Sequence, residues 1–369
     1  MKIIILKSNL KAGLDAVGRT VGANPNLPIL GSVLIKAQNN QIKISATNLE
    51  LAITKQTFGK IIEEGSVVVP YNTLSNMINN VSTERVNLEV KKNNLIVKTD
   101  NYEANLQGMD EKEFPIIPAI ENKKEYLEIE GGLLKESLSK TVIAAEVSDL
   151  RPEISGAFFA IEPSELRIVA TDSFRLAEAT ISGKQLKNNF SQGTQITVPL
   201  KTAQELTRVL AEDEVTKLYT DRTQILFESE SLELISRTIE GKFPDYQAII
   251  PKQTETEVVV ERSGLVGGLK LVGAFSGRGN EVTVRAKDKK VLELYASESN
   301  LGENRYMLPA KINGPEAEIV FNWQYLLDGV KNESSKDVLM GLNGEEKPTL
   351  IKSPESGANY FYILMPIKS

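Results

Sequence analysis

The chain contains no histidine and no cysteine among its 369 residues. Histidine is the usual general base near neutral pH and the commonest metal ligand, so its absence excludes Ser-His-Asp hydrolysis and most zinc chemistry. The absence of cysteine excludes disulfides, thiolate metal sites and cysteine nucleophiles. Catalysis by carboxylates or lysine remains open, and the sequence indicates no metal and no cofactor.

A basic excess and a long apolar run are also missing. The formal net charge is −6, so the chain as a whole does not have the charge of a basic DNA-binding protein. The apolar run near the N-terminus, residues 3–6, is too short for a signal peptide or a membrane span, which predicts a cytoplasmic protein. Hydrophobic residues make up 41% of the chain, enough to fill the cores of two or three domains.

One segment recurs three times along the chain. Residues 67–74 are echoed by residues 196–203 and then by residues 319–326, with starts 129 and 123 residues apart. The strand-like segment 41–48 matches 165–172 at an offset of 124. Self-similarity at a nearly constant interval indicates three tandem copies of one domain.

Each copy contains two helical patterns and several alternating strands. The first helices are predicted in residues 7–23, 131–148 and 262–279, and the second in residues 70–81, 199–212 and 322–336. Amphipathic helices next to alternating strands predict an α+β domain, in which two helices pack on antiparallel sheet. Polar segments near residues 122 and 251 place the domains at 1–122, 123–251 and 252–369.

Charge is distributed unevenly over these segments. The three predicted domains carry net charges of +1, −6 and −1, whereas the six helical segments together carry +5. A face made of helices would therefore be mildly positive and would attract phosphates weakly and without reading base sequence. The alternative is that these lysines and arginines are ordinary solvent-exposed residues of amphipathic helices.

Four motifs allow a family comparison. Residues 27–31 (LPILG), 169–176 (VATDSFRL), 239–246 (IEGKFPDY) and 365–367 (MPI) resemble motifs of the bacterial sliding clamp, the beta processivity subunit of the replicative DNA polymerase. The resemblance implies a head-to-tail homodimer of three-domain chains, forming a six-domain ring that encircles double-stranded DNA without sequence specificity. It implies a non-catalytic accessory subunit that a clamp-loading ATPase opens. The chain has no G-x-x-x-x-G-K-[ST] phosphate loop of its own.

The resemblance also implies one groove per chain for short linear peptides of the polymerase, the clamp loader and repair proteins. Its predicted lining is Ile154, Thr171, Ser173, Phe174, Arg175, Leu176, Pro244, Ala248, Ile249, Pro348, Ile363, Leu364, Met365, Pro366 and Ile367. For Leu176, Ile249 and Leu364, ordinary core packing is the alternative. Phe174, Ala248 and Ser369 differ from residues common in the family, so the peptide preference is expected to differ.

Two further sets of residues follow from the resemblance. The predicted DNA-contacting residues are Asn24, Asn72, Asn79, Ser148 and Lys201, and the predicted dimer-interface residues are Leu106, Ala274 and Phe275. Asparagine replaces basic residues on the expected inner face, so weak, salt-sensitive DNA contact is predicted.

Two alternative functions remain at this point. One is a ring- or arc-shaped interaction scaffold that does not encircle DNA, suggested by the acidic balance. The other is an enzyme that uses carboxylates, with Asp172 and either Glu178 or Asp245 as candidates. Asp172 matches Asn48 one copy earlier, which favours a turn-capping role over chemistry.

Overall fold

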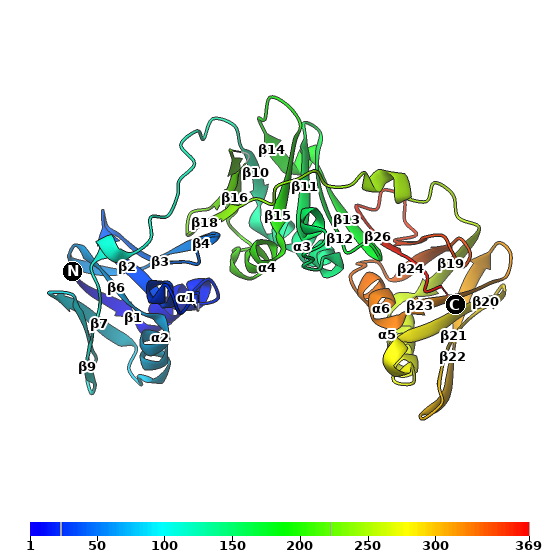
Figure 1. Cartoon of the computed structure of the whole chain (residues 1–369), viewed down its shortest axis with the longest axis horizontal. Helices are drawn as coiled ribbons and strands as arrows, with labels where there is room; N and C mark the ends of the chain where they lie inside the picture. The colour runs from blue at the N-terminus through cyan, green and yellow to red at the C-terminus, as the bar shows by residue number, and fades with distance from the viewer. Residues whose placement is uncertain (23, 222, 369) are drawn as a thin grey trace. The chain divides into compact units, whose positions relative to one another are not determined.

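The computed structural model describes residues 1–22, 24–221 and 223–368 (Figure 1). The first repeat contains the elements β1 (Lys2–Leu6), α1 (Lys7–Val17), β2 (Ser32–Gln38), β3 (Gln41–Thr47), β4 (Leu51–Thr57), β5 (Gly59–Glu63), β6 (Gly65–Pro70), α2 (Tyr71–Asn80), β7 (Arg85–Lys91), β8 (Asn94–Lys98) and β9 (Glu103–Leu106). Its strands form the antiparallel orders β5-β1-β7-β8-β9 and β4-β3-β2-β6.

The second repeat has the same element order. It contains β10 (Leu127–Glu130), α3 (Gly131–Thr141), β11 (Gly156–Glu162), β12 (Glu165–Thr171), β13 (Arg175–Ser182), β14 (Leu186–Asn188), β15 (Thr194–Pro199), α4 (Leu200–Val209), β16 (Val215–Thr220), β17 (Gln224–Glu228) and β18 (Leu232–Arg237). Its strand orders are β14-β10-β16-β17-β18 and β13-β12-β11-β15, which match those of the first repeat strand for strand.

The third repeat differs by one fused strand. It contains β19 (Thr256–Glu261), α5 (Arg262–Gly273), β20 (Glu281–Asp288), β21 (Val291–Glu298), β22 (Gly302–Asn313), β23 (Ala317–Asn322), α6 (Trp323–Lys331), β24 (Asp337–Leu342), β25 (Thr349–Lys352) and β26 (Tyr360–Leu364). The long β22 pairs with β21 over its first part and with β19 over its last part. It therefore replaces the two strands β4 and β5 of the first repeat. The predicted α+β fold of three repeats is confirmed.

All six predicted helices are present, but each ends earlier in the sequence than predicted. α1 ends at Val17, α3 at Thr141 and α5 at Gly273, rather than near residues 23, 148 and 279. The Thr141 hydroxyl donates to the carbonyl of Ser137 at 2.9 Å, which satisfies a terminal acceptor, and the chain then continues as a 3₁₀ turn. After α5, the N–H groups of Phe275 and Ser276 donate to the carbonyls three residues earlier, those of Val272 and Gly273, at 2.9 and 3.2 Å. Apolar periodicity does not detect these local stops.

The repeated segment at residues 67–74, 196–203 and 319–326 contains the end of a strand and the start of the second helix of each repeat. Pro70 ends β6 and Pro199 ends β15, so neither residue has to donate a backbone hydrogen bond at the helix start. In the third repeat Asn322 occupies this place, and its side chain accepts from the backbone N–H groups of Gln324 and Tyr325 at 3.0 and 3.3 Å. Different residues therefore begin the same helix.

Neighbouring repeats are joined by strand pairing. β18 pairs antiparallel with β4, which makes a nine-stranded sheet, and β13 pairs antiparallel with β26, which makes a twelve-stranded sheet. The chain divides into two compact units, each of which contains one of these junctions: residues 1–135, 185–191 and 204–238 form one unit, and residues 136–184, 192–203 and 239–369 form the other.

The cores of these units consist of buried aliphatic side chains between helices and sheets. In the second unit, α5 and α6 pack together over the sheet, and Leu265, Leu269, Leu326 and Val330 point into a large apolar cluster. No helix in the described part of the chain is long and apolar enough to cross a membrane.

Candidate functional site

The predicted groove residues lie in the second compact unit, around the junction of β13 and β26. Their exposure falls into three classes. Ile154, Thr171, Leu176, Ile363 and Leu364 are buried; Arg175, Pro244, Pro348, Met365, Pro366 and Ile367 are half-buried; Ser173, Phe174, Ala248 and Ile249 are exposed. Ser369 lies outside the described residues.

The buried members rest on an apolar cluster that belongs to both the second and the third repeat. Ile154, Leu176, Leu350 and Ile363 pack with aromatic residues in this cluster. Phe158 and Phe243 stack with ring centroids 4.5 Å apart, and Tyr246 meets both rings edge-on. Stacked and edge-to-face aromatic pairs hold their partners in a fixed geometry. The cluster therefore forms a firm apolar base, which we call the groove floor.

Leu176 and Leu364 are core residues, which is the alternative that the sequence left open for them. Leu176 and Leu364 each expose 1% of their surface and lie in different apolar clusters. Ile249 differs, because it exposes 48% of its surface, and Phe174 exposes 64%. Phe174 and Ile249 are therefore the most exposed large apolar side chains of the predicted set, whereas Leu176 and Leu364 are covered by their neighbours.

A tight turn between β12 and β13 presents Phe174. The Asp172 carboxylate accepts from the backbone N–H groups of Phe174 and Arg175, both at 2.9 Å, and Ser173 adopts a positive φ of 80°. The Phe174 carbonyl in turn accepts from the Met365 N–H at 2.9 Å. The C-terminal segment and the exposed phenylalanine are thus held together by the main chain.

Arg175 lies on the face of β13 opposite to Leu176, because side chains alternate along a strand. Its guanidinium forms ion pairs with Asp172 at 2.9 Å and with Asp328 of α6 at 2.7 Å. The same group lies over the Tyr325 ring, 4.0 Å from its centroid. Its side chain is only 11% exposed. In this arrangement Arg175 links the turn to α6.

The three carboxylates considered for catalysis do not form a catalytic group. Asp172 caps the turn as predicted, and Asn48 accepts from Glu50 and Leu51 in the same way at 3.0 and 2.8 Å. Glu178 is buried, and this burial raises the pKa of its carboxyl group. Asp245 is exposed. The described part of the chain contains no cluster of three or more acidic residues that could hold a metal ion.

Most residues predicted to contact DNA are accessible. Asn24, Asn72, Asn79 and Lys201 are exposed, the last three of them on α2 and α4. Ser148 is half-buried and takes part in a loop, since its N–H donates to the Ser155 hydroxyl at 2.9 Å and its own hydroxyl accepts from Arg151 N–H at 3.2 Å.

The predicted interface residues lie at the edge strand β9 and at the end of α5. Leu106 ends β9, the last strand of the five-stranded sheet. Ala274 is exposed and Phe275 half-buried at the end of α5, where the Asn304 side chain donates to the Leu271 carbonyl at 3.2 Å. Asn304 belongs to the first part of β22, so the end of α5 lies beside that strand.

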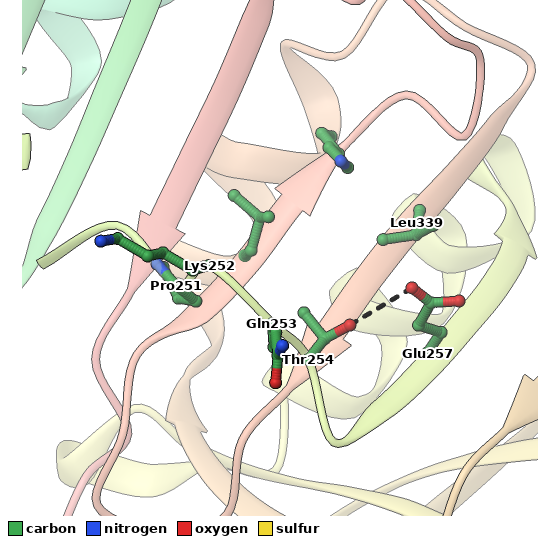
Figure 2. Close-up of a pocket in the computed structure, with 8 residues that line it drawn as sticks. Pro251, Lys252, Gln253, Thr254, Glu257 and Leu339 are labelled. Atoms are coloured by element: carbon green, nitrogen blue, oxygen red, sulfur yellow. Dashed lines mark hydrogen bonds between the residues drawn. The ribbon is translucent and has the colours of Figure 1, made fainter.

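Two features of this region were not predicted from the sequence. One is the contact of Arg175 with Tyr325 and Asp328, because residues 150 positions apart give no local signal. The other is a pocket beside the groove floor, lined by Pro251, Lys252, Gln253, Thr254, Glu257, Leu339, Leu350 and Lys352 (Figure 2). Residues 251–256 were predicted only as a polar segment at a domain boundary, and polar character alone does not show that such a segment also lines a pocket.

Substitutions of Asp172 test its structural role. Asp172→Asn retains an acceptor for the two backbone N–H groups, as Asn48 does, whereas Asp172→Ala leaves them without one. We expect Asp172→Ala to be less stable than Asp172→Asn by about 1–2 kcal/mol, measured as a lower thermal midpoint. Equal midpoints for the two variants would contradict the capping role.

Comparison with known proteins agrees with this geometry. Models of the N-terminal, central and C-terminal domains of the DNA polymerase III beta subunit match residues 1–118, 128–245 and 247–368. The beta sliding clamp of Synechocystis sp. is 27% identical, with 100% of this chain and 99% of that protein covered. The crystal structure of the DNA polymerase sliding clamp from Bacillus subtilis is 26% identical, has a TM-score of 0.93, and is matched over 100% of this chain and 99% of its own. The clamp from Bartonella birtlesii, solved bound to griselimycin, is also 26% identical, with a TM-score of 0.91 and full coverage of both chains. The chain therefore belongs to the DNA polymerase III beta-subunit family of sliding clamps and is a non-catalytic processivity factor of the polymerase.

Proposed function

We propose that two copies of this chain pair head to tail into a closed ring that encircles duplex DNA, and that each copy offers one peptide groove to its partners. The observation that supports ring closure most strongly is the strand pairing between repeats. It occurs twice within the chain in one register, and in the described part of the chain each strand of a third equivalent pair has one edge without a partner strand.

The two internal junctions have the same register. Ser236 pairs with Leu51 where β18 meets β4, and Leu364 pairs with Arg175 where β26 meets β13. By their positions in the neighbouring hairpins, Leu51 and Arg175 are equivalent, and Ser236 and Leu364 are equivalent. The junction is therefore a repeated structural unit of the fold.

In the first repeat, the strand equivalent to β18 and β26 is β9. In the third repeat, the strand equivalent to β4 and β13 is the first part of β22. β9 pairs with β8 on one side, and residues 302–309 of β22 pair with β21 on one side. Exposed edges of this kind readily pair with another chain. Applying the register of the internal junctions to a second copy sets Leu106 opposite Gly302 and Glu103 opposite Arg305.

Charge and position support this pairing. The Glu103 and Arg305 side chains are 60% and 54% exposed, and each forms an ion pair within its own chain, Glu103 with Lys98 at 2.9 Å and Arg305 with Glu293 at 3.6 Å. Both remain accessible to a second chain. Opposite charges directly across an antiparallel pair are favourable. The end of α5 lies beside the same part of β22, which gives Ala274 and Phe275 a place in the interface. A head-to-tail arrangement of two copies contains this interface twice and leaves neither edge unpaired.

We further propose that the groove floor with Phe174 and Ile249 binds short linear peptides of the polymerase, the clamp loader and repair proteins. Covering one large apolar side chain contributes about 1.5–3 kcal/mol, so two exposed anchors can support a weak, exchangeable complex. The half-buried Met365 suits a surface that accepts varied side chains, because methionine is flexible. Arg175 positions the Phe174 turn rather than forming the apolar surface.

DNA contact is proposed to be weak. Asn24, Asn72, Asn79 and Lys201 offer polar groups to phosphate, with Ser148 as a further member of the set, but Lys201 alone among them adds a positive charge. A closed ring remains on DNA by topology and needs little affinity. We assign the domains to residues 1–122, 123–251 and 252–369, and we place the protein in the cytoplasm, where replication proteins act.

A charge exchange tests the interface. Glu103→Arg or Arg305→Glu alone sets like charges opposite each other at both interfaces, and we expect the dimer to weaken by about tenfold or more. The double variant, which exchanges the charges, should recover a mass near twice 40.7 kDa in analytical ultracentrifugation. Single variants that remain as dimeric as the wild type would contradict this register.

DNA topology separates the ring from the alternative scaffold. On a nicked circular duplex, in the presence of a clamp-loading ATPase, we expect the protein to elute with the DNA even at high salt. Cutting the circle with a restriction enzyme should release it, because an encircling ring slides off an end. A scaffold that does not encircle DNA predicts the same weak, salt-sensitive association with both forms.

A further inference from the structure

The pocket next to the groove floor has the character of a site for an anion (Figure 2). The residues that line it include two lysines, Lys252 and Lys352, and one acidic residue, Glu257. Neither lysine forms an ion pair within the described residues, whereas the Thr254 hydroxyl donates to the Glu257 carboxylate at 3.2 Å, as the dashed line in Figure 2 marks. The local charge is positive in a chain whose net charge is −6.

The pocket is continuous with the groove floor. Leu350 belongs to both, since it packs with Leu176 and Ile363 in the floor and also lines the pocket. Lys352 follows Leu350 by two positions on β25, so both side chains lie on the same face of the sheet. A ligand that covers the floor therefore reaches Lys352 without crossing the sheet.

The connecting segment provides a second link. Ala248 and Ile249 belong to the predicted groove, Ile250 packs against the floor, and Pro251 and Lys252 line the pocket. In Figure 2, Lys252 extends away from Thr254 and Glu257, and the residue is exposed. A flexible, exposed lysine stem lets the ammonium group reach a bound carboxylate, although ordering the stem costs rotamer entropy.

We propose that the peptides bound in the groove carry acidic residues beside their apolar anchors, and that Lys252 and Lys352 bind these carboxylates. This inference rests on the proposed peptide groove and specifies the class of partner. The apolar anchors provide most of the affinity, and the two lysines select acidic over neutral flanks. The carboxylate of Glu257 faces the same pocket and limits the selectivity, because it repels the same anions.

Peptide binding to the full-length chain tests this selection. Two fluorescent synthetic peptides share one leucine–phenylalanine core, with three aspartates at each end in the first and three asparagines in the second. We expect the aspartate peptide to bind the wild type more tightly, by about 2- to 5-fold for each lysine engaged. This advantage should shrink as salt is raised, because exposed charges are screened.

Matched variants identify the groups responsible. Lys252→Gln with Lys352→Gln removes both charges and keeps most of each stem, so the two peptides should then bind equally, at the affinity of the asparagine peptide. Lys289→Gln with Lys290→Gln removes two exposed lysines from the β20–β21 turn and should leave the preference unchanged. Far-ultraviolet circular dichroism and the thermal midpoint check that each variant is folded.

The outcomes separate the inference from the function on which it rests. If both peptides bind the wild type equally, or if the preference survives in the Lys252→Gln, Lys352→Gln variant, the inference is overturned while the groove stands. If neither peptide binds, and Phe174→Ala changes nothing, the peptide groove itself is wrong and the inference falls with it.

Discussion

Main-chain hydrogen bonding between repeats is the constraint on which the rest of this structure depends. A sheet that ends in an unpaired strand exposes donors and acceptors that must find partners. Here β18 completes the sheet that begins in the first repeat, and β26 completes the one that begins in the second. The candidate functional surfaces follow from this arrangement. The groove floor forms where two repeats share a sheet, and the proposed ring closes where the same junction is still missing.

The same constraint explains how nearly identical domains acquire different tasks. The turn after β3 and the turn after β12 use the same Asx cap and the same positive φ, at Leu49 and Ser173. The surroundings differ. Beside Ser173, an exposed phenylalanine and a half-buried C-terminal segment produce an accessible apolar surface, and Arg175 is held against α6 by two carboxylates. The fold thus repeats the scaffold, while a few side chains distinguish the junction that we propose as the peptide groove.

The sequence predicted the repeated elements well because their signals are local. Amphipathic helices, alternating strands and the proline before α2 and α4 each depend on residues close together in the chain. The capping role of Asp172 was also predictable, since the matched Asn48 can perform it. Helix ends were less predictable, because the hydrogen bonds of Thr141 and of the residues after α5 set them rather than apolar periodicity. The contacts of Arg175 with Tyr325 and Asp328 and the pocket at Lys252 depend on the packing of segments far apart in the sequence, which no local pattern encodes.

Ring closure through β9 and β22 is the central claim, and the absence of cysteine from the chain allows a direct test. In the proposed register Ala104 lies opposite Asn304 of the second copy, and Cα atoms in such antiparallel pairs are about 4.5–5.5 Å apart, within the range that a disulfide spans. The variant with Ala104→Cys and Asn304→Cys should, on mild oxidation, give one covalent dimer with both interfaces closed and no larger species in non-reducing electrophoresis. A ladder of higher oligomers, or a chain that remains monomeric after oxidation, would contradict the closed head-to-tail ring.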